Sequence, residues 1–444
     1  MSDEPQIPTH SPVRVTPRSA APPPRTAPAA AAPSGRWLPR LLVVGLVLAA
    51  LNLRPAITSL GALLEEVRTG LHMSGGVAGL LTSVPPLCFA VFGVAAPRLA
   101  RRFGGAAVVC AGMAAIAVGV ACRPFAGGTP GFLAASALAL AGIALSNVLM
   151  PAVVKRYFPD RVGTMTGLYS MALALGTSLA AAVTVPLTAA LGGGWRAGLG
   201  VWAALAALAV LPWIPVVRDH RAAARPVPSV GVPSAGAVPS VAVPSEGAPA
   251  AGPRVARSRT AWALACFFGL QATGAYITMG WLPQIFRDAG VPAGTAGVLL
   301  AVTMVMGVPL AFVIPRVAGR MRQQGPIVVA LGLAGLAGYA GLLTAPAAGA
   351  WLWAVLLGIS NCAFPLALTM IGMRARTGTG VVRLSAFAQC AGYLLSIPGP
   401  ILVGALYQHS GGWTAPLALM AGLIVPQMAA GVLAGRDRTV EDEA

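Results

Sequence analysis

Long apolar blocks, rather than short alternating stretches, set the pattern of this chain. The blocks run for roughly 18 to 28 residues with few internal charges, which is the length that an α-helix needs to cross a bilayer. We therefore expect an all-α membrane protein with twelve spans. The predicted spans cover residues 40–65, 75–96, 105–122, 129–151, 163–190, 196–217, 260–287, 293–315, 326–344, 349–373, 383–407 and 413–434.

Proline-rich and polar segments divide the chain into five parts. Residues 1–39 are rich in Pro, Ala and Arg, which predicts a disordered tail. The linker 218–259 repeats the triplet Val-Pro-Ser four times and is typical of a flexible spacer. It separates an N-terminal half, 40–217, from a C-terminal half, 260–434, and a short charged tail, 435–444, ends the chain.

The two halves are similar to each other in sequence. APRLARRFG (96–104) after the second span matches IPRVAGRMRQQG (314–325) after the eighth, and GIALSNVLMP (142–151) in the fourth span matches GISNCAFP (358–365) in the tenth. Two six-helix repeats with the same topology are typical of transporters, whose binding site lies near the bilayer midplane where the repeats meet.

Basic residues predict the orientation of the chain in the membrane. The net charge is +18, although only 9% of the residues are charged. The loops after even-numbered spans carry twelve Arg or Lys residues, against four (Arg68, Arg123, Arg196 and Arg287) after odd-numbered spans. By the positive-inside rule we expect both termini and the linker in the cytoplasm, and the protein in the plasma membrane. This explanation of the charge is favoured over binding to nucleic acid.

Polar side chains gather in spans 1, 4, 5, 7, 10 and 11, whereas spans 3, 6, 9 and 12 are apolar nearly all round. A helix that is apolar on every side faces lipid, and a polar group in hydrocarbon needs a partner or water. We therefore expect the six polar spans to ring a cavity, with the four apolar spans outside as supports.

The first span carries the most informative charge, because Arg54 lies at the centre of LNLRPAITSL, residues 51–60. An arginine at bilayer depth costs between about 2.5 and 17 kcal/mol, depending on the measure, so such residues are usually functional. Thr58 follows one turn later on the same helical face, and Pro55 would let the span bend. A structural alternative is that Arg54 caps carbonyl groups freed by Pro55, but binding of a solute is favoured.

Polar and aromatic residues in the other cavity spans supply further candidates. Their amides would offer hydrogen bonds to a solute, and their tyrosines would shape the cavity. A packing alternative stays open for each, since such residues also join membrane helices to one another. The candidates are Asn147, Tyr169, Gln271, Tyr276, Asn361, Gln389 and Tyr393.

Several kinds of chemistry find no support in the sequence. No Asp, Glu, Lys or His lies near the centre of a predicted span, and the six cysteines occur singly in apolar runs. Metal-binding spacings, cofactor motifs and a nucleophile paired with a base are missing, so we expect neither an enzyme nor a metal or cofactor site. A lone central arginine favours an anionic or strongly dipolar solute, held by the guanidinium fork.

Several stretches resemble one family of carriers. NLRPAITSLGALL (52–64), NVLMPAVVKRYFP (147–159) and SAFAQCAGYLLSIPGPILVGAL (385–406) are similar to the cyanate permease and 2-nitroimidazole transporter family of the major facilitator superfamily. The resemblance covers essentially residues 40–434. It implies alternating access with spans 1, 4, 7 and 10 at the cavity, and it supports the cavity residues Arg54, Asn147, Gln271 and Asn361.

The loop after the second span keeps part of the superfamily's pattern. APRLARRFG retains the basic pair Arg101 and Arg102 but lacks the acid that usually precedes it. We expect Arg101, Arg102 and Pro55 to take part in the conformational change.

These observations predict a monomeric secondary active or facilitative carrier of a small anion or polar solute, which would be cyanate-like, carboxylate-like or nitroimidazole-like. One alternative is an exporter of drugs or metabolites with the same fold, although span 5 lacks a clear antiporter signature of glycine and proline. The other is a membrane sensor that binds a solute without transporting it.

Overall fold

The structure, a computed structural model, describes residues 38–223 and 255–443. Within these two ranges, twelve helical segments are long and apolar enough to cross a membrane, which confirms the predicted all-α class. Most of the predicted tail (1–39) and most of the predicted linker (218–259) lie outside the described residues.

Several of the predicted spans consist of more than one helix. The N-terminal half contains α1 (Leu38–Asn52), α2 (Pro55–Ala62), α3 (Leu64–Gly70), α4 (Gly75–Phe103), α5 (Gly105–Cys122), the 3-10 turn η1 (Arg123–Phe125), α6 (Thr129–Tyr157), α7 (Val162–Ala190), α8 (Trp195–Gly200), α9 (Trp202–Val210) and α10 (Trp213–Ala223). The C-terminal half contains α11 (Arg259–Asp288), α12 (Ala293–Val305), α13 (Gly307–Arg320), α14 (Gly325–Thr344), α15 (Ala350–Asn361), α16 (Ala363–Met373), α17 (Gly378–Ser396), α18 (Pro398–Ser410) and α19 (Thr414–Ala434).

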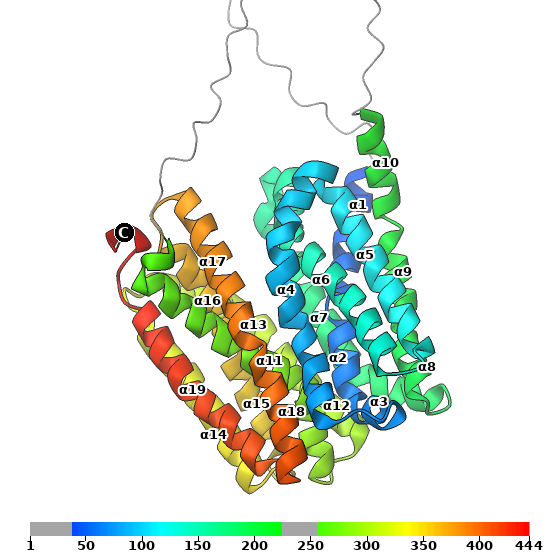
Figure 1. The fold of residues 1–444 in the computed structure, drawn as a ribbon. Coiled ribbons are helices and arrows are strands. Elements are labelled where there is room, and N and C mark those ends of the chain that lie inside the picture. Colours follow the sequence, from blue (N-terminus) through cyan, green and yellow to red (C-terminus); the bar gives the residue numbers. More distant parts are fainter. Residues whose placement is uncertain (1–37, 224–254, 444) are drawn as a thin grey trace, which may run out of the picture.

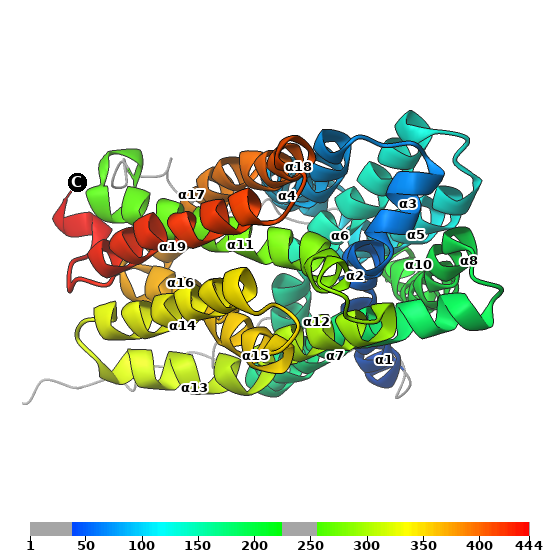
Figure 2. The ribbon, with the colours of Figure 1, turned by 90° about the horizontal axis from the view of Figure 1, so that it is seen from below.

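The two halves lie side by side, as Figures 1 and 2 show from two directions. They meet where α4 packs against α18, α7 against α12 and α2 against α11. We call this the closed end; it includes α3 and the start of α4. At the opposite end, α4 and α17 diverge in Figure 1, although they pack against each other further along. We call this the open end; it carries the basic residues Arg101, Arg102 and Arg320.

Prolines interrupt the two spans that carry Arg54 and Asn361. Helix α1 stops at Asn52, and α2 restarts at Pro55, which has no N–H to donate back along the helix. Helix α15 stops at Asn361, four residues before Pro365, so the Asn361 carbonyl has no helical donor. Broken helices inside a membrane are tolerated where they line a cavity, and these two breaks lie at such a place.

The short tail after α19 packs against the C-terminal half. Val440 is fully buried, and the Glu443 carboxylate accepts hydrogen bonds from the Ser258 hydroxyl at 2.7 Å and from the Thr260 amide at 3.0 Å. Glu443 therefore caps the first turn of α11, where unpaired backbone N–H groups favour a negative charge.

Candidate functional site

A cavity of about 450 Å³ lies between the two halves. It is lined from the junction of α1 and α2, from α7, and from α11 to α13 and α15 to α17. The lining continues along α13 to Pro315 and along α16 to Thr369, both on the stretches that run toward the open end. The volume falls within the range of roughly 300–1,000 Å³ that is common for small-molecule sites.

Five of the nine predicted binding residues line this cavity. They are Arg54, Gln271, Tyr276, Asn361 and Tyr393. The N-terminal half supplies the arginine and the C-terminal half supplies the other four, so the site is completed only where the two halves meet.

Arg54 is the only charged residue in the lining of the cavity. It lies at the break between α1 and α2, and its own carbonyl accepts the Thr58 hydroxyl at 3.2 Å. Tyr276 and Tyr393 line the same cavity from the C-terminal half. Among the described residues, no carboxylate forms an ion pair with Arg54.

Two further predicted residues lie beside the cavity, bonded to each other. The Tyr169 hydroxyl donates to Asn147 Oδ1 at 2.5 Å and joins α7 to α6. Tyr169 directly precedes Ser170, which lines the cavity, so this bonded pair lies next to the lining. Neither residue belongs to the lining in this conformation.

Thr58 and Gln389 are also outside the lining. Thr58 is fully buried and uses its hydroxyl on the Arg54 carbonyl. Gln389 Nε2 donates to the Ser385 hydroxyl, one turn earlier on α17, at 2.7 Å. The predicted roles of Thr58 and Gln389 in binding remain predictions.

The remaining predicted residues concern conformation. Pro55 begins α2 at the break beside Arg54. Arg101 and Arg102 are exposed in the last turn of α4 at the open end, and Arg102 lies 5.2 Å from the centroid of the neighbouring Phe103 ring. Within the described ranges neither arginine forms an ion pair, as expected where the two halves are apart.

Aromatic rings form one wall of the cavity. Tyr393 stacks on Phe89 with centroids 5.0 Å apart and meets Phe268 edge-on at 5.0 Å. Phe364, which also lines the cavity, lies 5.8 Å from Phe268. Phe89 comes from the N-terminal half, so the aromatic cluster spans both halves. Its members lie far apart in sequence, and helical spacing within a single span could not have revealed the cluster.

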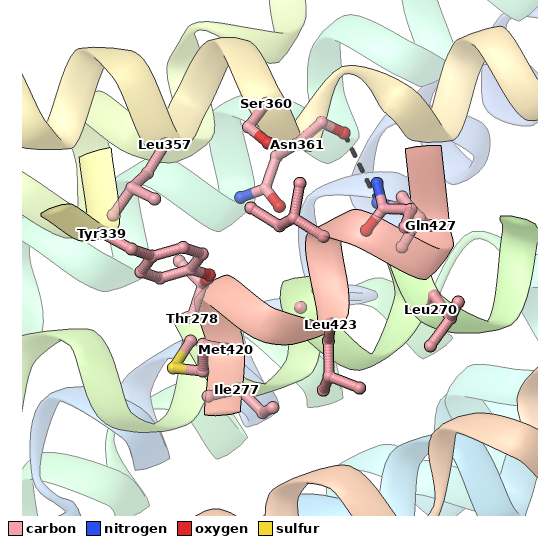
Figure 3. Close-up of a pocket in the computed structure, with 13 residues that line it drawn as sticks. Leu270, Ile277, Thr278, Tyr339, Leu357, Ser360, Asn361, Met420, Leu423 and Gln427 are labelled. Atoms are coloured by element: carbon pink, nitrogen blue, oxygen red, sulfur yellow. Dashed lines mark hydrogen bonds between the residues drawn. The ribbon is translucent and has the colours of Figure 1, made fainter. Parts of the chain in front are cut away.

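A much smaller polar pocket, of about 20 Å³, lies behind Gln271 and Asn361 inside the C-terminal half. Figure 3 shows the Asn361 amide pointing into it, with Tyr339 and Gln427 around the same space. Gln271 Nε2 donates to the free Asn361 carbonyl at 3.4 Å, and Gln271 Oε1 has no partner among the described residues. The pocket has room for one water molecule, which would complete the hydrogen bonds of these amides.

Arg123, counted above in the loop after the third span, is in fact buried. Its side chain is 1% exposed in η1 at the closed end of α5. It donates from Nη1 to the Ala56 carbonyl at 2.7 Å and from Nε to the Ser136 hydroxyl at 3.0 Å. Arg123 is therefore more deeply buried than Arg54, which is only half-buried. Sequence position alone could not reveal this, because Arg123 directly follows an apolar run.

Contacts between the halves seal the closed end. Arg287 of α11 makes a two-pronged ion pair with Glu66 of α3, at 2.9 and 3.0 Å, and the Ser83 hydroxyl donates to the Ile397 carbonyl at 2.7 Å. Glu65 pairs instead with Arg68 on its own helix, and the hydrogen bond from Arg68 lowers the pKa of the Glu65 carboxyl. The cavity is therefore shut off at this end.

Twelve membrane helices in two similar halves, with a polar cavity shut at one end, define a membrane transporter. The Major Facilitator Superfamily matches residues 42–395, and the chain belongs to this superfamily.

Three comparisons describe what the chain is similar to. It is 32% identical to the 2-nitroimidazole transporter of Escherichia coli (strain K12), over 90% of this chain and 96% of that one. It is 29% identical to the cyanate transport protein CynX of the same organism, over 87% of this chain and 95% of that one. A crystal structure of a D-xylose-proton symporter superposes with a TM-score of 0.67 at 12% identity, over 91% of this chain and 99% of that one. The two proteins therefore share the fold.

The relatives bear out the predicted resemblance to cyanate and nitroimidazole carriers. The protein is a multi-pass plasma-membrane transporter of small solutes.

Proposed function

We propose that the protein carries a small anionic solute by alternating access, with the Arg54 guanidinium binding the negative group. The observation that carries this proposal is the charge of the cavity. Arg54 is the one charged group in the lining, and no described carboxylate pairs with it. An unpaired guanidinium in a low-dielectric site favours an anion that can accept its parallel hydrogen bonds.

The neutral groups opposite Arg54 suit the rest of such a solute. Gln271, Tyr276 and Asn361 line the cavity from the C-terminal half, while the Asn361 amide itself points into the smaller pocket behind it. An anion bound to Arg54 could therefore also contact the C-terminal half. A ligand held by both halves favours a conformation in which they close around it, as alternating access requires.

The aromatic wall extends the proposal to planar solutes. Phe364 and Tyr393 both line the cavity, and their rings offer flat apolar surface beside a single positive charge. Aromatic carboxylates fit this combination, and so does the anion of a nitroimidazole. Cyanate, named for one relative, is smaller and would use only the polar part of the site.

We also propose an orientation and an assembly state. The open end carries the basic loops, so by the positive-inside rule it faces the cytoplasm, and this conformation is inward-open. The cavity lies between the two halves of the chain, so we propose that a monomer is the transporting unit.

Uptake into proteoliposomes tests the proposal. Purified protein is supplied with labelled cyanate, benzoate or 2-nitroimidazole, and wild type is compared with Arg54→Gln and Arg54→Lys. We expect saturable uptake of at least one anion, a large rise in KM for Arg54→Gln, and a smaller one for Arg54→Lys. The assignment is refuted if Arg54→Gln transports that anion with the wild-type KM.

A further inference from the structure

Arg123 has an unusual setting for a guanidinium group. Two of its nitrogens donate to Ala56 and Ser136, and its charge lies 5.7 Å from the centroid of the Phe132 ring. The third nitrogen, Nη2, is buried and has no hydrogen-bond partner among the described residues. A buried polar group is normally hydrogen-bonded, so this unpaired nitrogen needs an explanation.

The carboxylates at the closed end do not supply the missing counter-charge. Glu65 is paired with Arg68, and Glu66 with Arg287. Asp288 accepts hydrogen bonds from the Tyr407 hydroxyl at 2.9 Å and the Trp413 indole at 2.7 Å. Burying a cation without a counter-charge costs free energy. A neutral donor could make the hydrogen bond to the Ala56 carbonyl, so this bond alone does not explain why a charged side chain lies here.

A second small pocket, of about 10 Å³, lies beside Arg123. Its walls come from α2, α4 and α6 of the N-terminal half and from α11 of the C-terminal half. The α11 residues are Tyr276 and Gly280, and Tyr276 also lines the central cavity. Tyr276 therefore separates the pocket of Arg123 from the cavity of Arg54.

Helix α11 closes this pocket by close backbone approach. A Cβ atom added to Gly61 would lie 1.9 Å from the Met279 carbonyl oxygen, and one added to Gly280 would lie 2.6 Å from Thr82. The pocket is therefore small because the two halves touch here. Separation of the halves at this end, which alternating access requires, would enlarge it and expose Nη2 of Arg123.

We propose that Arg123 is a second binding station for the transported anion, covered by α11 in this conformation and exposed when the closed end opens. The anion would accept a hydrogen bond from Nη2 of Arg123 and then pass Tyr276 to Arg54, which lies two residues before Ala56, the residue whose carbonyl Arg123 contacts. The inference rests on the proposed function, because it assigns to Arg123 the same class of solute, a small monoanion.

The inference predicts an effect that depends on the side of the membrane. Arg123→Gln should raise the KM for anion entering from the closed end by about 10-fold or more, the cost expected for a lost charge-assisted hydrogen bond. The KM for anion entering from the open end should change much less, because Arg123 is covered there. Arg123→Lys, which keeps the charge, should retain most of the affinity from the closed end.

The experiment measures initial rates with labelled cyanate and labelled benzoate in right-side-out and inverted membrane vesicles. Ser136→Ala is the matched control, because it removes a hydrogen bond to Arg123 without removing the charge, and it should leave both KM values near wild type. The amount of folded protein in the membrane is measured for each variant. A variant that is merely less stable should show less folded protein and a lower maximal rate, with an unchanged KM.

The outcomes separate this inference from the function on which it rests. If Arg54→Gln raises KM from both sides while Arg123→Gln changes both sides equally or neither, the anion carrier stands and the second station is refuted. If neither arginine affects KM, or if wild type takes up neither probe, the anion carrier itself is refuted and the second station with it.

Discussion

The ion pair between Glu66 and Arg287 is expected to hold the closed end shut. Glu66 belongs to α3 and Arg287 to α11, so the pair joins the two halves through two contacts of 2.9 and 3.0 Å. The substitution Glu66→Gln keeps the shape of the side chain but removes its charge. We expect it to shift the protein from the conformation described here toward one that is open at this end.

The size of the shift follows from the exposure of the pair. The two side chains are 23% and 31% exposed, so water screens part of their attraction. Exposed pairs are worth roughly 0.2–1 kcal/mol, and the two-pronged geometry places this one near the upper end, at about 1 kcal/mol. A change of that size alters the ratio of two conformations about fivefold.

Cysteine labelling measures this ratio. Ser83 is 1% exposed beneath the closed end, so a cysteine at this position should react with a membrane-impermeant maleimide only after the halves separate. The assay uses right-side-out vesicles and a background without the six natural cysteines. Glu66→Gln should speed the labelling of Ser83→Cys about fivefold.

Two comparisons make the result specific to the ion pair. Glu65→Gln breaks a pair within α3 and should leave the labelling rate nearly unchanged. Arg287→Gln should match Glu66→Gln, and the double variant should add little, because both residues act through the same contact. An unchanged labelling rate in both single variants would show that this pair does not hold the halves together.

Two further predictions concern the closed end and the tail. Gly61→Ala places a Cβ 1.9 Å from a backbone oxygen of the other half, so it should slow uptake about 10-fold and favour the conformation that is open at this end. Gly274→Ala is the control, because a Cβ there has no atom within 4 Å, and it should behave like wild type in the same assays. Burial raises the pKa of Glu443, but hydrogen bonds from Ser258 and Thr260 outweigh burial and lower it. A lowered pKa stabilises the folded protein above pH 4.5, the ordinary pKa of this group, and the benefit is lost as the pH falls through the lower folded value. Glu443→Gln should therefore cost about 1 kcal/mol at pH 7, seen as a lower Tm in detergent, and the difference from wild type should shrink in acid; an equal difference at both pH values would contradict this account.

Hydrophobic pattern and internal repetition were sufficient to predict the fold. Bilayer thickness fixes the length of an apolar run, and twelve such runs in two similar sets leave few arrangements. The helix breaks were harder to predict. Pro85, Pro86 and Pro97 lie inside the continuous helix α4, whereas Pro55 and Pro365 accompany breaks, so proline alone does not decide where a membrane helix stops.

The candidate site was predicted only in part, because helical spacing does not survive a break. In a continuous helix, the Thr58 and Arg54 side chains would share a face. The chain is not helical at Arg54, and the Thr58 hydroxyl donates to the Arg54 carbonyl rather than facing the cavity. Arg123 shows the opposite case. Its burial depends on Ala56 and Ser136, which are distant in sequence, and nothing local to Arg123 marks it as buried.

The central claim, that Arg54 binds the negative group of the solute, is tested most directly by equilibrium binding. The transported anion is titrated into purified wild type, Arg54→Lys and Arg54→Gln by calorimetry. A charge-assisted hydrogen bond worth about 1.5–3 kcal/mol predicts a Kd roughly 10- to 150-fold higher for Arg54→Gln, with Arg54→Lys between the two. An Arg54→Gln protein that folds normally and binds the anion with the wild-type Kd would contradict the account.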